Sequence, residues 1–157
     1  CELQADMKPV IYGKLLLNLN NALNAIADQP IKTQLENHAL RKVYAAAQRE
    51  WLEVAKAEGV GLVQFTAVKP SWMPIILRFP NWIFLRLAKT MLDIDPHARS
   101  SMWEDIQSGR KTEIEFLNEA VVKRGEILGV DVPVNRKISS LIHSLERGDT
   151  VSLEELY

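Results

Sequence analysis

Apolar residues recur every three or four positions along most of the chain, a spacing that predicts α-helices. The first helix is expected over residues 9–28, because Asp28 and Pro30 interrupt the pattern there. A second and longer helix is expected over residues 33–58. Gly59 stands just past its end, in the position that helix-terminating glycines prefer.

Residues 59–80 interrupt the helical pattern with two glycines and three prolines, so a long loop is expected there. Within it, the run from Leu62 to Val68 is the only candidate for a strand, and it does not alternate strongly. A third helix is expected over residues 81–92. Because no strong strand pattern occurs anywhere, the sequence predicts an all-α fold.

Three later helix starts are marked by a Ser or Thr followed three residues on by Glu, which is the pattern of a capping box. The pairs are Ser101 with Glu104, Thr112 with Glu115, and Ser152 with Glu155. Helices are therefore expected to begin near residues 102, 113 and 153. The helix from 113 should end near Gly129, and Pro133 should open the next one.

Composition and charge restrict the class of protein. The 157 residues are 47% hydrophobic, enough for a single domain, residues 1–157, around one core. The net charge is -1, so nucleic acid is not expected as a partner. Cys1 is the only cysteine and no cluster has metal-ligand spacing, so we expect no metal site and a reducing, cytoplasmic setting. A chain that opens on Cys1, without a signal-peptide pattern, is expected to be a piece of a longer protein.

The segment from Trp72 to Leu92 is rich in Trp, Ile, Leu and Phe, but prolines and basic residues interrupt it. No run of about 20 apolar residues remains, so a membrane span is not expected. A buried helix, or a helix at a protein interface, is the favoured interpretation. A helix that lies on a membrane surface is the alternative.

The first predicted helix carries polar residues that work against it. Asparagine is a poor helix former, yet four asparagines fall within residues 18–24. At about 100° per residue, Lys14, Asn18 and Asn21 occupy a strip roughly 60° wide on one side of the helix. A solvated surface is the simpler explanation, but such surfaces normally use residues that favour helices. The strip is therefore a candidate for binding or catalysis.

Other candidate residues have an equally good structural explanation. Ser101 could serve only as a helix cap, and Glu113 only as a negative charge at the positive end of a helix. The histidines lie on separate predicted elements without a nucleophile or acid at a suitable spacing, so no catalytic triad is predicted. Gly59-Val60-Gly61 lacks the third glycine and the preceding strand of a dinucleotide-binding turn.

The residues around these candidates resemble a known family. Lys14-Leu-Leu-Leu-Asn18 is followed far along the chain by Ser100-Ser101-Met102-Trp103-Glu104-Asp105-Ile106, Gly109-Arg110, Thr112-Glu113-Ile114 and Leu117-Asn118, then by the stretch from Gly129 to Pro133 and by Asn135. In order and spacing, these elements resemble the C-terminal domain of ketopantoate reductases. The resemblance covers residues 10–28 and 97–142, and residues 29–96 match only in helical character.

The resemblance implies an all-α domain of the 6-phosphogluconate dehydrogenase C-terminal-like fold. Family members pair it with an N-terminal Rossmann domain that binds NADPH, and they reduce 2-dehydropantoate to pantoate in pantothenate biosynthesis. This chain is expected to lack the Rossmann domain and to be inactive alone. By the resemblance, Lys14 matches the catalytic lysine and Glu113 the active-site glutamate, while Asn18 and Ser101 match substrate-binding residues.

Two positions depart from the family pattern. A second family asparagine falls on Ala22, and Asn21 is the candidate to replace it. Glu119 stands where the family often has glycine after the Leu-Asn pair. These differences concern which 2-oxo acid is the substrate rather than the fold.

The implied reaction suits these residue types. Hydride delivered to the C2 carbon of a 2-oxo acid leaves negative charge on the carbonyl oxygen, and Lys14 would donate a proton to it. The alternative is a non-catalytic helical interaction module, such as a homodimer formed through the segment from Trp72 to Leu92. Such a module would keep the fold of the family without its reaction.

Overall fold

The computed structural model describes the backbone of residues 2–91 and 95–157 and the side chains of residues 7–89 and 95–157. These residues form α-helices and short 3-10 helices and contain no strand, which confirms the all-α prediction. In chain order the elements are α1 (Glu2–Ala27), α2 (Ile31–Glu36), α3 (His38–Glu58), η1 (Pro70–Trp72), α4 (Met73–Leu77), α5 (Asn81–Met91), α6 (Ser101–Gln107), η2 (Ile114–Phe116), α7 (Asn118–Leu128), α8 (Pro133–Glu146) and η3 (Leu153–Leu156).

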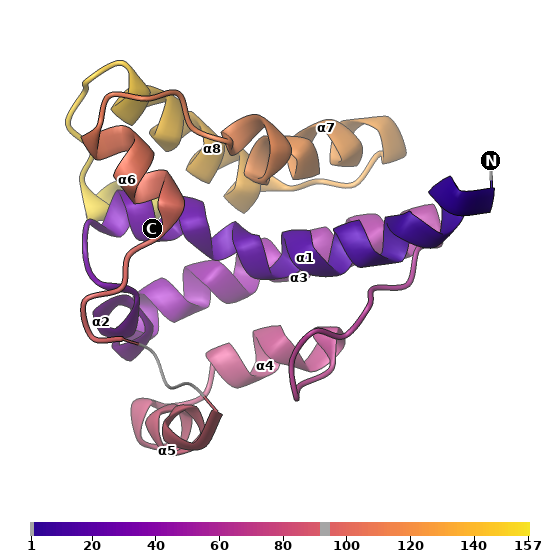
Figure 1. Cartoon of the computed structure of the whole chain (residues 1–157), viewed down its shortest axis with the longest axis horizontal. Coiled ribbons are helices and arrows are strands. Elements are labelled where there is room, and N and C mark those ends of the chain that lie inside the picture. Colours follow the sequence, from indigo (N-terminus) through magenta and orange to yellow (C-terminus); the bar gives the residue numbers. More distant parts are fainter. Residues whose placement is uncertain (1, 92–94) are drawn as a thin grey trace.

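The two long helices, α1 and α3, lie side by side through the middle of the molecule (Figure 1). Helices α7 and α8 pack on one side of this pair, while α4 packs against α3 on the other side and leads into α5. Helix α6 packs across the C-terminal half of α1. Every other helical layer therefore rests on α1 and α3.

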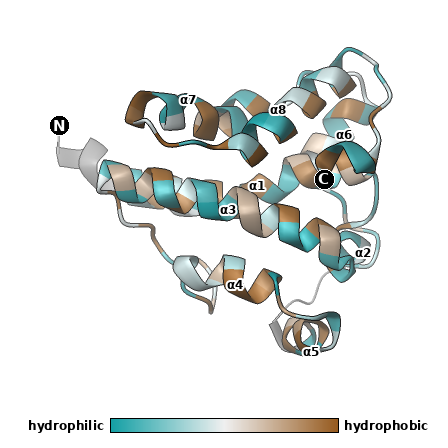
Figure 2. Cartoon of the chain, turned by 180° about the vertical axis from the view of Figure 1, so that it is seen from behind, coloured by the Kyte–Doolittle hydropathy of each residue, from teal (hydrophilic) through white to brown (hydrophobic). Residues whose placement is uncertain are grey.

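The core lies between these helices and is built from their buried apolar residues. Trp51 of α3 is 2% exposed, and its ring centroid lies 4.4 Å from that of Tyr12 on α1. Its Nε1 also donates a hydrogen bond to Tyr12 O at 3.0 Å, so the buried indole leaves no polar atom unpaired. Apolar residues are not confined to the core, because α4 and α5 also carry them on their outer surface (Figure 2).

Helix α1 begins at Glu2, earlier than predicted, and continues through Pro9. Proline removes one backbone donor from a helix. The carbonyl oxygen of Pro9 accepts a hydrogen bond from Val63 N at 3.0 Å. Gly13 makes room for this contact, since a Cβ there would clash with Val63 O and lie 2.9 Å from a ring carbon of Phe65. The segment after α3 thus docks directly on α1.

The prediction of a single helix over residues 33–58 is wrong, because the chain forms two helices there, α2 and α3. Asn37 separates them in an extended conformation, and its Oδ1 accepts hydrogen bonds from Ala39 N at 3.0 Å and Leu40 N at 3.4 Å. Asparagine is among the best residues for capping the start of a helix, so the chain breaks there. The predicted end is confirmed, since Gly59 terminates α3 with φ of 75°.

Residues 59–80 are more regular than the predicted loop, because η1 and α4 form within them. Both of these helices have a proline in their first turn. The N–H that proline lacks would have no acceptor within the helix at that position, so no hydrogen bond is lost. The run from Leu62 to Val68 does not form a strand. The helix predicted over residues 81–92 is α5, and Leu92 lies outside the described residues.

A buried arginine fastens α4 and α5 to α3. The Arg41 side chain donates from Nε to Leu77 O at 3.0 Å, and from Nη2 to Phe79 O at 2.9 Å and Asn81 Oδ1 at 2.8 Å. Its guanidinium carbon lies 4.1 Å from the centroid of the Phe84 ring. Among the helices that the structure describes, none has the length and apolar character needed to cross a membrane.

The later helix starts differ from the capping predictions in detail. Helix α6 begins where expected, but Ser100 rather than Ser101 caps it. The start predicted at 113 is the 3-10 helix η2, and α7 begins only at Asn118. The capping box of Ser152 with Glu155 is confirmed, although it opens a 3-10 helix. The end of α7 and the start of α8 are as predicted.

Candidate functional site

The strip predicted on the first helix, Lys14, Asn18 and Asn21, lies at the surface of α1. Lys14 and Asn18 are exposed, and Asn21 is half-buried. Within the described residues, none of the three side chains makes a hydrogen bond or an ion pair. Because asparagine also weakens a helix, stability alone does not explain this strip.

The other two asparagines of α1 are used inside the protein. Asn24 is fully buried, and its Nδ2 donates to Gln29 O and to Gln34 Oε1, both at 2.9 Å. Its Oδ1 accepts a hydrogen bond from Ser100 N at 2.8 Å. Gln34 Nε2 donates in turn to Asn20 Oδ1 at 2.7 Å. This network joins α1 to α2 and to the start of α6.

Ser101 begins α6 at the Asn21 end of the strip. Ser100 Oγ donates to Asn21 O at 2.9 Å and accepts from Trp103 N at 3.2 Å, which fixes the first turn of α6 on α1. Ser101 itself is exposed, and its hydroxyl has no partner in the described part of the chain. Ser101 therefore follows directly on a residue that contacts α1 at Asn21, far away in the sequence.

Glu113 lies in the connection between α6 and α7. It is exposed, and its carboxylate has no partner among residues 7–89 and 95–157. The residue before it is held firmly, because Thr112 N and Oγ1 donate to Glu146 Oε1 at 2.9 Å and 2.7 Å. No ion pair joins Glu113 to Lys14 in the structure, so their meeting across one cleft stays a prediction.

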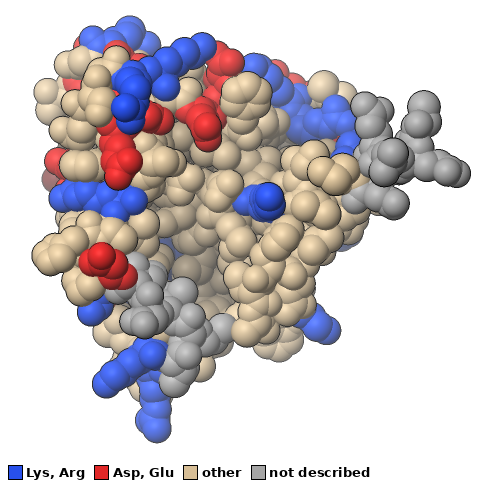
Figure 3. Space-filling view, in the orientation of Figure 1, with Lys and Arg blue, Asp and Glu red and all other residues tan. Residues whose placement is uncertain are grey.

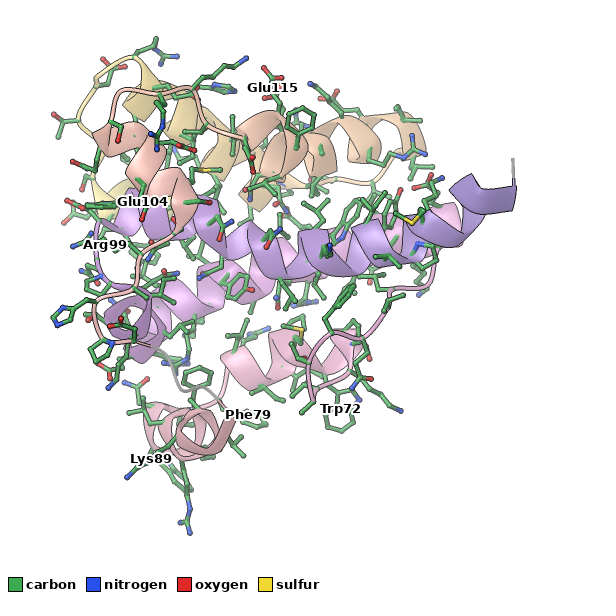
Figure 4. The ribbon with its side chains drawn as sticks, in the orientation of Figure 1. Trp72, Phe79, Lys89, Arg99, Glu104 and Glu115 are labelled. Carbon is green, nitrogen blue, oxygen red and sulfur yellow. The ribbon has the colours of Figure 1, made fainter. Side chains whose placement is uncertain are left out.

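The elements that carry these residues share one side of the molecule. Helix α1 runs across the front in Figure 1, α6 crosses it, and the connection from α6 to α7 passes along the same side. The surface there is hollowed between a basic group that stands over α1 and the mixed charges over α6 (Figure 3). In Figure 4, Glu104 marks α6 and Glu115 marks η2 on this side.

The sequence did not predict one cluster of side chains at the edge of this side of the molecule. The Arg99 guanidinium carbon lies 4.2 Å from the centroid of the Trp103 ring, and Asp28 Oδ1 accepts from both Arg99 Nη1 at 3.1 Å and Trp103 Nε1 at 2.6 Å. Arg99 is labelled in Figure 4. The cluster ties the end of α1 to α6. Its only sequence signal was the helix-ending pattern at Asp28, which does not reveal distant partners.

The two departures from the family pattern lie in different surroundings. Ala22 is completely buried in the core, while Asn21 beside it has a free side chain near the surface. Glu119 lies 3.2 Å from Lys123 Nζ and 3.1 Å from His143 Nε2. The hydrogen bond from Lys123, with a further one from His143, lowers the pKa of Glu119 although burial opposes the change. Glu119 is thus partnered within α7 and α8.

The other two histidines and the glycines that follow α3 lie in ordinary structural surroundings. His38 Nε2 lies 3.1 Å from Arg78 O, and His97 is exposed. Within the described residues, no group of three His, Cys, Asp or Glu has the geometry to hold a metal ion. Gly59 ends α3, so the Gly59-Val60-Gly61 stretch follows a helix and not the strand that a dinucleotide-binding turn requires.

Known proteins are similar to this chain in sequence over most of its length. The profile of the family described as "Ketopantoate reductase PanE/ApbA C terminal" matches residues 6–146. A 2-dehydropantoate 2-reductase from Pyrobaculum aerophilum is 33% identical over 143 residues, which are 90% of this chain and 44% of that protein. The chain therefore spans less than half the length of this relative.

Solved structures give the same result. A PanE/ApbA family ketopantoate reductase from Ralstonia eutropha JMP134 has a TM-score of 0.67 at 32% identity, over 87% of this chain and 40% of that one. A D-mandelate dehydrogenase described with NADH and anilino(oxo)acetate shares the fold, with a TM-score of 0.68 at 23% identity over 87% and 40% of the two chains. A dimeric ketopantoate reductase from Staphylococcus aureus also shares it, with a TM-score of 0.66 at 20% identity over 90% and 44%. Since the family profile covers nearly the whole sequence, this chain belongs to the ketopantoate reductase family and corresponds to its C-terminal domain.

Proposed function

We propose that this chain is the substrate domain of an NADPH-dependent 2-oxo acid reductase, which reduces 2-dehydropantoate to pantoate for pantothenate biosynthesis in the cytoplasm. One observation carries the proposal. Neighbouring polar groups on α1, at the start of α6 and in the connection after it are tied into networks, whereas five predicted site side chains have no partner among the described residues. Free donors and acceptors on elements that share one side of the molecule are what a small polar ligand needs. The five are Lys14, Asn18, Asn21, Ser101 and Glu113.

In this proposal Lys14 is the general acid. Reduction of a ketone adds a hydride to carbon and a proton to oxygen, and a bound nicotinamide supplies the hydride. The Lys14 ammonium group donates the proton to the ketone oxygen as negative charge develops there. Glu113 is the second catalytic residue, and its carboxylate balances the positive charge of the lysine.

The other three residues hold the substrate. The amide groups of Asn18 and Asn21 donate hydrogen bonds to substrate oxygens and keep the ketone next to Lys14. Ser101 donates its hydroxyl hydrogen to the substrate carboxylate or accepts one from a substrate hydroxyl. Holding both reactants in one geometry removes much of the entropic barrier to the reaction.

The nucleotide would be bound mainly by an N-terminal Rossmann domain. The described residues of this chain contain no strand from which a dinucleotide-binding turn could start, but they fit the substrate side of the reaction. The D-mandelate dehydrogenase of the same fold, described with NADH and anilino(oxo)acetate, supports the pairing of a nicotinamide nucleotide with a 2-oxo acid. We expect this chain alone not to oxidise NADPH.

Replacing Lys14 in the complete two-domain protein tests this function. Lys14→Ala should lower the turnover of ketopantoate about a hundredfold or more, because the proton donor is removed. Lys42→Ala is the matched control, since it removes another exposed lysine, from α3, and should leave turnover unchanged. Full turnover in Lys14→Ala would contradict the proposal and favour a non-catalytic interaction module.

A second proposal concerns the outer surface of η1, α4 and α5, which we propose binds a second copy of the chain. Trp72 and Trp82 are 57% and 71% exposed, and Ile75 is 51% exposed. Trp72 points away from α1 in Figure 4. Exposed apolar patches of this kind mark interaction surfaces. The S. aureus enzyme of this fold is described as dimeric, which supports a second copy as the partner.

Light scattering of the purified protein tests the homodimer. Trp82→Glu should convert a dimer into a monomer, because it places a charge in an apolar interface. Ile127→Glu is the control, since Ile127 is 70% exposed on α7, away from this surface. A wild-type protein that is monomeric at micromolar concentration contradicts the proposal. Binding of that monomer to anionic lipid vesicles would favour the alternative of a helix on a membrane surface.

A further inference from the structure

The carboxylate of Glu146 occupies an unfavourable place. Glu146 is the last residue of α8, at the negative end of the helix dipole, and its side chain is only 16% exposed. Burial is the largest single influence and raises the pKa of Glu146. The pKa is nevertheless below its ordinary value, because the hydroxyl and backbone N–H of Thr112 and the ring of His143 bind the carboxylate. A charge in such a place persists only with several partners.

The two oxygens of Glu146 bind different elements. Oε1 accepts both hydrogen bonds from Thr112, at 2.9 Å from N and 2.7 Å from Oγ1. Oε2 lies 3.0 Å from His143 Nδ1, and the other ring nitrogen of His143 lies 3.1 Å from Glu119 Oε2. Thr112 is therefore anchored, through Glu146 and His143, to both α7 and α8.

Glu113 comes directly after this anchor. Thr112 is 5% exposed and Ile114 is fully buried, and Ile114 N donates to Thr112 Oγ1 at 3.4 Å. Phe116 N donates to Glu113 O at 3.0 Å. The backbone of Glu113 is thus fixed on both sides, while its carboxylate has no partner among the described residues.

We infer that Glu146 is a positioning residue, which acts through Thr112 to fix the direction in which Glu113 points toward the substrate. The inference rests on the proposed role of Glu113 in the reductase. A shift of about 1 Å in a group that contacts the substrate lowers the rate severely, so a residue that never touches the substrate still controls the reaction.

A double-mutant cycle in the complete two-domain protein tests this, with NADPH and ketopantoate as substrates. Glu146→Ala should lower kcat about tenfold with a smaller change in KM, because it displaces Glu113 without removing it. The double variant Glu113→Ala with Glu146→Ala should be no slower than Glu113→Ala alone, since there is then nothing left to position. Glu146→Gln keeps an acceptor for Thr112 and should restore most of the activity. Glu126→Ala, at an exposed glutamate of α7, is the surface control.

Hydrogen exchange measured by mass spectrometry on the same proteins gives a readout independent of activity. In Glu146→Ala the amide of Thr112 should exchange at least about tenfold faster, while exchange in α1 stays unchanged. Unchanged exchange at Thr112, or additive losses in the cycle, would overturn the inference. Full activity in Glu113→Ala would instead contradict the proposed role of Glu113 and the positioning with it. Faster exchange at Thr112 would then still reveal the anchor, so the two failures are distinguishable.

Discussion

The two polar faces of α1 are made of the same residue type and are used in opposite ways. Asn20 and Asn24 point toward α2 and α6, where both side chains are hydrogen-bonded. On average, Asn18 and Asn21 lie about a third of a turn around the helix from them, and their side chains have no partner in the described part of the protein. One face therefore builds the fold, and the other is available for a ligand.

This difference shows how a binding residue is told from a structural one. A buried amide whose hydrogen bonds are all made stabilises the protein, because its removal leaves partners unsatisfied. An exposed amide without partners only weakens its helix. Residues that disfavour their own secondary structure, and make no stabilising contact in exchange, are expected at functional sites.

Replacing Asn24 should have the largest effect on stability. Asn24→Ala removes the acceptor of Ser100 N and the donor to Gln34, both inside the protein, so we expect the free energy of unfolding to fall by about 3 kcal/mol. Urea denaturation measures this. Asn18→Ala is the matched control on the same helix and should unfold at the same urea concentration or higher. Equal losses from the two variants would erase the distinction between the faces.

A second structural contact of α1 should depend on pH. Glu58 of α3 accepts hydrogen bonds from Lys8, Tyr12 and Arg124, and the bond from Arg124 is the main reason that its pKa falls to about 2, against the opposing effect of burial. Since the folded-state pKa lies below the ordinary value of 4.5, this stabilisation is complete above pH 4.5 and is lost as pH falls toward 2.

Glu58→Gln should therefore lower the free energy of unfolding by about 2 kcal/mol at pH 7, and the difference from wild type should shrink steadily below pH 4.5. Urea denaturation at several pH values measures it. Glu126→Gln, which affects an exposed ion pair with Arg136, should change stability by less than about 0.5 kcal/mol at any pH. A loss for Glu58→Gln that does not vary with pH would argue against the charge as its cause.

Replacing a residue on the face of Asn18 and Asn21 should change enzyme activity rather than stability. Asn18→Ala in the complete two-domain protein should lower kcat/KM for ketopantoate about tenfold, because one substrate hydrogen bond is lost, an effect of about 1.4 kcal/mol. Its stability should be unchanged or slightly higher, since alanine is the better helix former. Steady-state kinetics and urea denaturation of the same preparation measure both. Wild-type kinetics in this variant would remove Asn18 from the site.

Much of the fold could be predicted because helix signals are local. The apolar spacing, Gly59, Gly129 and Pro133 gave the all-α class and several helix ends correctly. The break at Asn37 was missed, since the apolar spacing runs through it and its capping bonds depend on an extended backbone. The helices within residues 59–80 were missed because prolines open helices as readily as they end them.

The candidate site divides in the same way. Lys14, Asn18 and Asn21 lie on one helix, so the 3.6-residue turn alone places them in a strip. Ser101 and Glu113 were identified only by family resemblance, because each has an ordinary structural explanation at a helix start. The structural roles of Asn24 and Glu146 were not predicted, since their partners lie 76 and 34 residues away in the sequence.

The sequence by itself determined that this protein is helical and that one side of its first helix carries polar groups that do not serve the helix. Only the tertiary structure decided which of those groups are engaged, where α6 crosses α1, and how Thr112 is anchored beside Glu113. The physical reason is that helix periodicity depends on neighbouring residues. The state of a polar group depends instead on which distant element packs against it, and that is fixed only when the core forms.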